Sequence, residues 1–296
     1  MKQDVLDSVE AEFENADYRI AETKGLFDMV AAGENSIVVK ILNNIDSATK
    51  SEALRLSAAA SSLDAMPVFV GAKTRKGPIE NRVYRRFGVP SVSLQGLGGI
   101  IHDKMLNYVS KGGSVVYVDG EKMRQRRERL GLSLGAISRS VGVSRKSIAE
   151  YENGGRARPE IAEKMENVLG TKITKNDLRA MTIENDKFRA RGLEAFVNKK
   201  LKTFGFDTTI ISKSIFNLAA RHGEVIIANV SENTRNLHKK AAMLHDISEV
   251  TNKRAVLVYK RFRKNNVEGV PVITKDDLNC MGGLEDFEQM VGKKGR

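Results

Sequence analysis

Cysteine, tryptophan and long apolar runs are scarce or absent in this chain of 296 residues. It has one cysteine, Cys280, and no tryptophan. A single cysteine excludes an internal disulfide and a cysteine-rich zinc site. The four histidines (His102, His222, His238 and His245) lack metal-binding spacing alongside carboxylates. No apolar run approaches the roughly 18 residues of a membrane span, and the acidic, amphipathic start is unlike a secretory signal. We therefore expect a cytoplasmic protein without a metal or other cofactor.

Positive charge is plentiful but unevenly distributed. The formal net charge is +12. Residues 1–119 carry 14 basic and 15 acidic side chains, residues 120–173 carry 12 and 7, and residues 174–296 carry 23 and 15. Clustered lysine and arginine release counterions from phosphate backbones, so the distribution predicts a polyanionic partner for the middle and last parts. A generally basic, solvated surface is the alternative.

The chain divides into three parts at two composition changes. A short β-rich run, GGSVVYVDGEK (112–122), gives way to a helical pattern, and Gly170 follows the last residue of that pattern as a helix-ending glycine does. We expect an N-terminal α/β domain (1–119), an all-α domain (120–172) and a C-terminal α/β domain (173–296). The stretch 171–178 is expected to be a connector.

The two outer parts resemble each other in the order of their signals. Ile37-Val38-Val39 aligns with Val225-Ile226-Ile227, and a Gly-Val-Pro triplet at 88–90 matches one at 269–271. Runs of β-branched residues at 37–42, 68–71, 225–230 and 255–259 predict strands that are covered on both faces. Helical spacing at 49–63 and 234–250 predicts the helices between them. The order suggests a duplication; coincidence of common α/β patterns is the alternative.

The middle part contains the stretch GLSLGAISRSVGVSRKSIAEYENG (131–154). Ser133 and Ser144 are placed as N-caps of two short helices. Gly142 between them allows a turn with positive φ. Ile137 and Ile148 lie on the inward faces, and Pro159 is suited to begin a further helix. Two helices joined by a glycine turn form a helix-turn-helix unit, whose second helix enters the major groove of DNA.

These residues resemble the Cro and phage-repressor type of helix-turn-helix domain over about fifty residues. The resemblance rests on the lead R-x-x-R-x-x-x-G-L-S, the turn G-V-S and the exit Y-E-N-G. The family usually has glutamine after the serine that begins its second helix, where it holds a DNA phosphate. This chain has Leu134 there, so one positioning contact is missing. The plan of the whole chain resembles a group of archaeal helix-turn-helix transcriptional regulators.

The resemblance assigns roles to individual residues of this chain. It implies that Arg145, Lys146 and Glu150 project from the recognition helix (144–152) toward base edges. Arginine and lysine read guanine, and a carboxylate accepts from the cytosine amine. The same resemblance places Ser133, Arg139, Ser144 and Ser147 near phosphates. Lys146 and Glu150, four residues apart, are alternatively an exposed ion pair.

The outer parts weakly resemble a second plan, the restriction-endonuclease-like fold. That fold binds its metal with an aspartate ahead of a strand that ends in acid-x-Lys. Asp28 and Lys40 fit, but Val38 stands at the acid position. The second copy has Asn217 in place of the aspartate, with Ile226 and Ala228 expected at the acid and lysine positions. Two carboxylates are the minimum for holding Mg²⁺ at a scissile phosphate, so we expect degenerate domains without catalytic residues.

Three smaller features complete the sequence. GLGG (96–99) lacks the Lys-Ser/Thr of a phosphate loop and is expected to be a turn. The basic stretches 74–86 and 259–266 each contain an aromatic residue, and each suits either nucleic-acid backbone contact or a solvated loop.

The leading interpretation is a sequence-specific regulator that binds double-stranded DNA as a homodimer and has an unknown effector. The alternatives are a nucleic-acid-processing enzyme with nuclease-like outer domains and a protein-bridging transcription cofactor. The paired carboxylate that the enzyme needs is missing from the sequence pattern.

Overall fold

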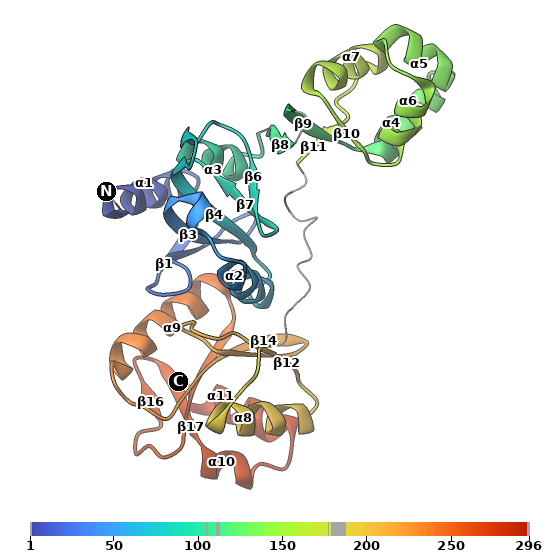
Figure 1. Cartoon of the computed structure of the whole chain (residues 1–296). Coiled ribbons are helices and arrows are strands. Elements are labelled where there is room, and N and C mark those ends of the chain that lie inside the picture. The colour runs from blue at the N-terminus through green and yellow to red at the C-terminus, as the bar shows by residue number, and fades with distance from the viewer. Residues whose placement is uncertain (1, 105, 111–112, 177, 179–187, 295–296) are drawn as a thin grey trace.

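The protein is described here by a computed structural model that covers residues 2–104, 106–110, 113–176, 178 and 188–294. It contains an N-terminal α/β unit, a helical unit in the middle and a C-terminal α/β unit (Figure 1). Figure 1 shows the helical unit set apart from the two α/β units, which lie against each other.

The N-terminal α/β unit is built on a seven-stranded sheet of the described residues. The strand order is β1-β2-β3-β4-β7-β6, with β5 beside β4. The β3/β4 and β4/β7 pairs are parallel, and β1/β2, β2/β3 and β6/β7 are antiparallel. Its elements are α1 (Lys2–Glu14), β1 (Arg19–Glu22), β2 (Met29–Ala32), β3 (Ile37–Asn44), the 3-10 turn η1 (Ile45–Ser47), α2 (Lys50–Ser62), β4 (Met66–Thr74), β5 (Gly77–Pro78), β6 (Tyr84–Arg86), β7 (Val89–Val92) and α3 (Leu94–Ile101).

The C-terminal α/β unit repeats this topology. Its sheet has the order β12-β13-β14-β15-β17-β16, with the same sequence of antiparallel and parallel pairs. The shared order agrees with the order of signals in the two sequence segments. The elements are α8 (Gly192–Thr203), β12 (Asp207–Ile210), β13 (Leu218–His222), β14 (Glu224–Ser231), α9 (Leu237–Thr251), β15 (Arg254–Tyr259), β16 (Asn266–Val267), β17 (Val270–Thr274), α10 (Lys275–Cys280) and α11 (Leu284–Lys294).

Strand register corrects the alignment of the two units by one residue. Met29 pairs with Val39 in the first sheet, and Leu218 pairs with Ala228 in the second. The counterpart of Lys40 is therefore Asn229 and not Ala228, and the counterpart of Val38 is Ile227 and not Ile226. The sequence pattern alone does not determine this register, because neighbouring β-branched residues are interchangeable in a strand that is buried on both faces.

The glycines at 96–99 lie within α3 and not in a turn, so that prediction is wrong. Ser93 caps this helix by accepting a hydrogen bond from the Gly96 amide. A methyl group at position 99 would lie 2.8 Å from a side-chain carbon of Leu106, and one at position 98 would collide with Glu12 of α1. The glycines therefore allow close packing on one helix face.

Helices α2 and α9 lie between the two sheets. One buried cluster combines residues of both α/β units, including Phe27 and Phe216, whose ring centroids are 6.2 Å apart. α9 contacts β1 and β2 of the first sheet, and α2 contacts β12 of the second. Helices α1 and α3 cover the outer face of the first sheet, and α8, α10 and α11 cover that of the second. The strands are thus covered on both faces, and the two units share one core.

An ion-pair cluster spans the same interface. Asp64, after α2, accepts from Arg221 at 2.7 Å and from Lys253 at 2.5 Å. Partial burial raises the pKa of this carboxyl group. The two cations outweigh burial and leave the pKa below its ordinary value. The carboxylate is therefore the form that joins the two units.

The helical unit comprises α4 (Gly120–Arg129), α5 (Leu134–Val141), α6 (Arg145–Glu152) and α7 (Pro159–Leu169). Its core contains Met123, Ile137, Ile148 and Met165, all buried. Beside the helices, β9 (Gly113–Val118) pairs with β8 (Tyr108–Ser110), β10 (Arg156–Ala157) and β11 (Thr174–Lys175). Part of the expected connector at 171–178 is therefore a strand.

The β8–β9 hairpin joins the helical unit to the N-terminal α/β unit. Tyr108 is buried in the core of that unit, and its ring meets Tyr117 edge to face at 4.8 Å. Arg85 lies 5.7 Å from both ring centroids and donates to the Tyr117 hydroxyl at 2.9 Å. Asn176 accepts from the Leu106 amide at 3.1 Å. These contacts attach the segment before the helical unit, at Tyr117, and the segment after it, at Asn176, to the N-terminal α/β unit.

Candidate nucleic-acid interface

The second and third helices of the helical unit are fixed by local capping. Ser133 accepts from the Ala136 amide and begins α5, and Ser144 accepts from the Ser147 amide at 3.0 Å and begins α6. Gly142 ends α5 with a φ of 79°, a backbone angle that residues other than glycine rarely adopt. This pair of caps around a left-handed glycine sets α6 at an angle to α5, as the sequence predicts.

The outer face of α6 carries the predicted base-contacting residues. Arg145, Lys146 and Glu150 are all exposed, whereas Ile148 is fully buried beneath them. No ion pair joins Lys146 and Glu150 in the described part of the chain. The three side chains are therefore available to a ligand on this face.

Arg145 lies against the start of α5. A methyl group at position 135 would lie 2.8 Å from Nε of Arg145, so glycine at 135 makes room for the guanidinium group. This contact places the positive charge of Arg145 beside the first turn of α5. This arrangement could not be predicted from the sequence because it joins residues of two helices.

The four predicted backbone-contacting residues lie at the two ends of α5 and at the first turn of α6. Ser144 and Ser147 hydroxyls are 2.9 Å apart, at the first turn of α6. Ser133 caps α5, and Arg139 is exposed in the last turn of α5. The serine oxygens cap the helices by accepting, and a hydroxyl also has a proton to donate.

Sequence reasoning missed a buried ion pair that ties α4 to α6. Arg127 donates to both carboxylate oxygens of Glu152, at 2.5 and 3.0 Å, and to the Leu132 carbonyl at 3.1 Å. The side chains are 14% and 6% exposed. Hydrogen bonding to Glu152 raises the pKa of the Arg127 guanidinium. Arg127 is the second arginine of the lead motif, and Glu152 is the glutamate of the exit motif. The presence of opposite charges in the two motifs is the sequence signal that indicates this pair.

The nuclease-like position in the first sheet is occupied by an internal ion pair. Asp28 accepts from the Ile41 amide at 2.8 Å, and Nζ of Lys40 lies 3.3 Å from its carboxylate. The same ammonium group donates to the Gly25 carbonyl at 2.7 Å. Val38, at the acid position, is fully buried.

The second sheet makes the corresponding contacts with two asparagines in place of the Asp28–Lys40 ion pair. Asn217 accepts from the Val230 amide at 2.7 Å, as Asp28 accepts from Ile41. Asn229, the counterpart of Lys40, donates to the Ile215 carbonyl at 2.6 Å. Asn217 also donates to the carboxylate of Glu194, whose pKa is raised by burial. Within the described residues, no group of three or more histidine, cysteine or acidic side chains is arranged to hold a metal ion.

Family comparisons match two segments of the chain. Residues 2–106 match the PD-(D/E)XK superfamily domain, and residues 123–176 match the helix-turn-helix family. The expectation of a nuclease-like fold is thus confirmed for the N-terminal unit. No solved structure matches. None of the described helices combines the length and apolar character needed to cross a bilayer.

Three archaeal relatives match nearly the whole chain, and each is named "Putative HTH-type transcriptional regulatory protein". The protein from Archaeoglobus fulgidus is 30% identical over 292 residues, covering 96% of this chain and 94% of the relative. Those from Thermoplasma acidophilum and Thermoplasma volcanium are 30% and 31% identical, covering 91% and 90% of this chain and 89% and 88% of their own. The chain belongs to this family of archaeal helix-turn-helix transcriptional regulatory proteins, as its motifs indicate.

Proposed function

We propose that the protein is a transcriptional regulator that binds double-stranded DNA in a sequence-specific manner, with α6 in the major groove. The observation that carries this proposal is the exposed face of α6. Three hydrogen-bonding side chains project from a helix that is otherwise anchored by buried Ile148 and by Glu152. A major groove is wide enough for one such helix.

Each residue of the interface has a distinct role in the proposal. Arg145 and Lys146 donate to guanine O6 and N7, and Glu150 accepts from a cytosine amine. Ser133, Ser144, Ser147 and Arg139 donate to phosphates and set the register of the helix on the duplex.

In this proposal the protein is a homodimer on DNA. One helix of eight residues reads only a few base pairs, so two recognition helices on half-sites about 34 Å apart supply the remaining specificity. The inner faces of the α/β units are covered by each other within one chain, so the contact between two chains uses other surfaces. Sedimentation of the protein–DNA complex tests the dimer, and a monomer that keeps full affinity contradicts it.

We further propose that the division at 119/120 and 172/173 separates one DNA reader from two non-catalytic scaffold domains. Asp28 is engaged by Lys40 and by a backbone amide, and valine stands at the second acid position. A Mg²⁺-dependent cut needs at least two carboxylates on the metal. Incubation of plasmid DNA with Mg²⁺ or Mn²⁺ tests this point, and nicking that is lost in an Asp28→Ala variant contradicts it.

Binding to fragmented genomic DNA, followed by sequencing, tests the main proposal. The full-length protein is mixed with fragments in moderate salt and Mg²⁺ with excess competitor. We expect one recurrent motif with two half-sites, which disappears with the Arg145→Ala, Lys146→Ala double variant. The control Arg129→Ala, Lys122→Ala removes two exposed charges from α4 and leaves α6 intact. Retention without any motif would favour a protein-bridging cofactor.

A further inference from the structure

A basic, open pocket lies in the C-terminal α/β unit, far along the chain from the recognition helix. Its volume is about 880 Å³. It opens beyond the carboxyl ends of β14 and β15, where ligands of open α/β sheets commonly bind. Two segments line it: Thr234, Asn236, Leu237, His238 and Lys239 near the start of α9, and Arg261, Phe262, Arg263 and Lys264 after β15.

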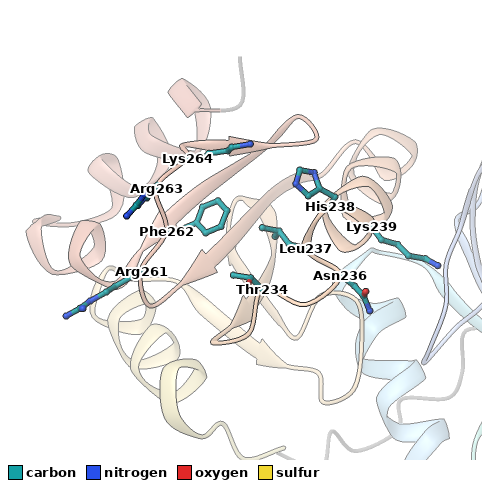
Figure 2. A pocket seen from close by; sticks show the side chains of 9 residues that line it. All are labelled: Thr234, Asn236, Leu237, His238, Lys239, Arg261, Phe262, Arg263 and Lys264. Atoms are coloured by element: carbon teal, nitrogen blue, oxygen red, sulfur yellow. The ribbon is translucent and has the colours of Figure 1, made fainter.

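The pocket has an apolar floor and a cationic rim. Figure 2 shows Phe262 and Leu237 facing each other at the centre, with Arg261 and Arg263 on one side and Lys239 on the other. Phe262 is half-buried and packs on the buried ring of Tyr259, with centroids 5.5 Å apart. Phe262 thus anchors the segment 261–264, while the charged side chains of Arg261, Arg263 and Lys264 remain exposed to solvent.

The rim cations lack internal counter-charges. No carboxylate lines the pocket, and within the described residues Lys239, Arg261, Arg263 and Lys264 take part in no ion pair. All four are exposed. His238 is the exception on the rim, since it contacts Glu268 at 2.7 Å.

The N-terminal α/β unit treats the corresponding edge differently. There Asp46, which follows β3, binds Arg86 at 2.5 Å and accepts from the Arg75 amide at 2.7 Å. The hydrogen bond from that amide and the Arg86 guanidinium lower the pKa of Asp46. Thr49 and Glu52 close a capping box at the start of α2. Within the described residues, this edge of the N-terminal unit thus carries a carboxylate, that of Asp46, whereas no carboxylate lines the pocket of the C-terminal unit.

We propose that this pocket binds the phosphate backbone of duplex DNA, as a second contact that is independent of base sequence. The exposed cations fan outward from an open floor, whereas a small anion is usually held by donors that converge in an enclosed site. A polymer with regularly repeated phosphates matches separated cations. The contact goes beyond the proposed role of α6, because it lies in another unit and reads no sequence.

The test measures salt dependence in a chain whose recognition helix is disabled. In the Arg145→Ala, Lys146→Ala background, affinity for a random-sequence duplex of about 30 base pairs is measured against salt concentration by fluorescence anisotropy. Each lost phosphate contact reduces the slope of log K against log salt by about 0.9. Adding Arg261→Ala, Arg263→Ala and Lys264→Ala should reduce the slope by roughly 2 to 3.

A matched triple variant removes the same charge elsewhere. Lys24, Lys199 and Lys202 are exposed and lie outside the pocket. Their replacement by alanine should change the slope by less than about 0.5. An equal change in both triple variants, or no change in the pocket variant, overturns the proposal. Thermal melts of both variants establish that the fold is retained.

Two further probes distinguish the occupant. If a single-stranded oligonucleotide of equal length binds the pocket more tightly than the duplex does, the assignment to duplex DNA is wrong. The assignment is also wrong if micromolar ATP raises the melting temperature only when Arg261, Arg263 and Lys264 are present, and if replacing these three residues leaves the salt dependence of duplex binding unchanged. This experiment does not depend on finding an operator, so its failure is distinct from failure of the proposed function.

Discussion

Replacing Glu152 by glutamine should loosen the helical unit more than any other single change of charge in it. The substitution keeps the size of the side chain but leaves the Arg127 guanidinium, 14% exposed, without its buried counter-charge. Removing one partner of a buried ion pair costs about 3 to 5 kcal/mol. That is a large fraction of the roughly 5 to 15 kcal/mol that stabilises an ordinary domain.

The control for this prediction uses the same arginine. Arg127 also contacts Glu128 at 3.3 Å, but Glu128 is 60% exposed. An exposed ion pair contributes about 1 kcal/mol or less, so Glu128→Gln should have little effect. A double variant, Arg127→Met with Glu152→Leu, should recover much of the loss, because apolar replacement of both partners is often neutral.

Amide hydrogen exchange, followed by mass spectrometry, is the suitable assay. Peptides from residues 120–170 report the opening of the helical unit alone, whereas a global melt averages over all three units. Glu152→Gln should reduce protection in α4 and α6 together and leave the sheets unchanged. Equal protection in Glu152→Gln and Glu128→Gln would refute the argument that burial makes the first pair strong.

Three further predictions concern the outer units. Asp64→Asn should lower the free energy of urea unfolding by about 1 kcal/mol or less at neutral pH. Because the pKa of Asp64 is lowered in the folded state, this stabilisation is present at a pH above the ordinary aspartate pKa and is lost as the pH falls below about 4. Asp28→Ala should lower the free energy of unfolding by about 3 kcal/mol, because it leaves the Lys40 charge unpaired. The double change Asp28→Asn with Lys40→Asn, which copies the second sheet, should keep the free energy of unfolding within about 1 kcal/mol of the native value in the same assay. The Glu194→Gln variant should be no less stable than the native protein at pH 7, because burial raises the pKa of Glu194. The stabilisation that Glu194 contributes is complete below about pH 4 and is lost as the pH rises through the pKa of the folded state, which thermal melts at a series of pH values will show.

The features that could be predicted from sequence depend on local interactions. Ser133, Gly142, Ser144 and Pro159 fix the ends of helices within a few residues of themselves, so the order of the helices in the middle of the chain could be predicted from the sequence. The buried strands were recognisable for a similar reason, since their β-branched runs are continuous.

The features that escaped prediction depend on residues far apart in the chain. The pairing of Arg127 with Glu152 joins two helices, and the sharing of one core by Phe27 and Phe216 joins two units. Helical glycines at 96–99 are explained only by the residues packed against them. The alignment of the two sheets required register, because a run of similar apolar residues does not determine it.

Chemical protection of guanine shows directly whether α6 lies in the major groove. On the DNA site selected from genomic fragments, dimethyl sulfate methylates guanine N7 in the major groove. We expect that the protein protects specific guanines in each half-site and that Arg145→Ala abolishes this protection, whereas Arg129→Ala preserves it. Full binding with every guanine N7 still reactive would contradict the placement of α6 in the major groove.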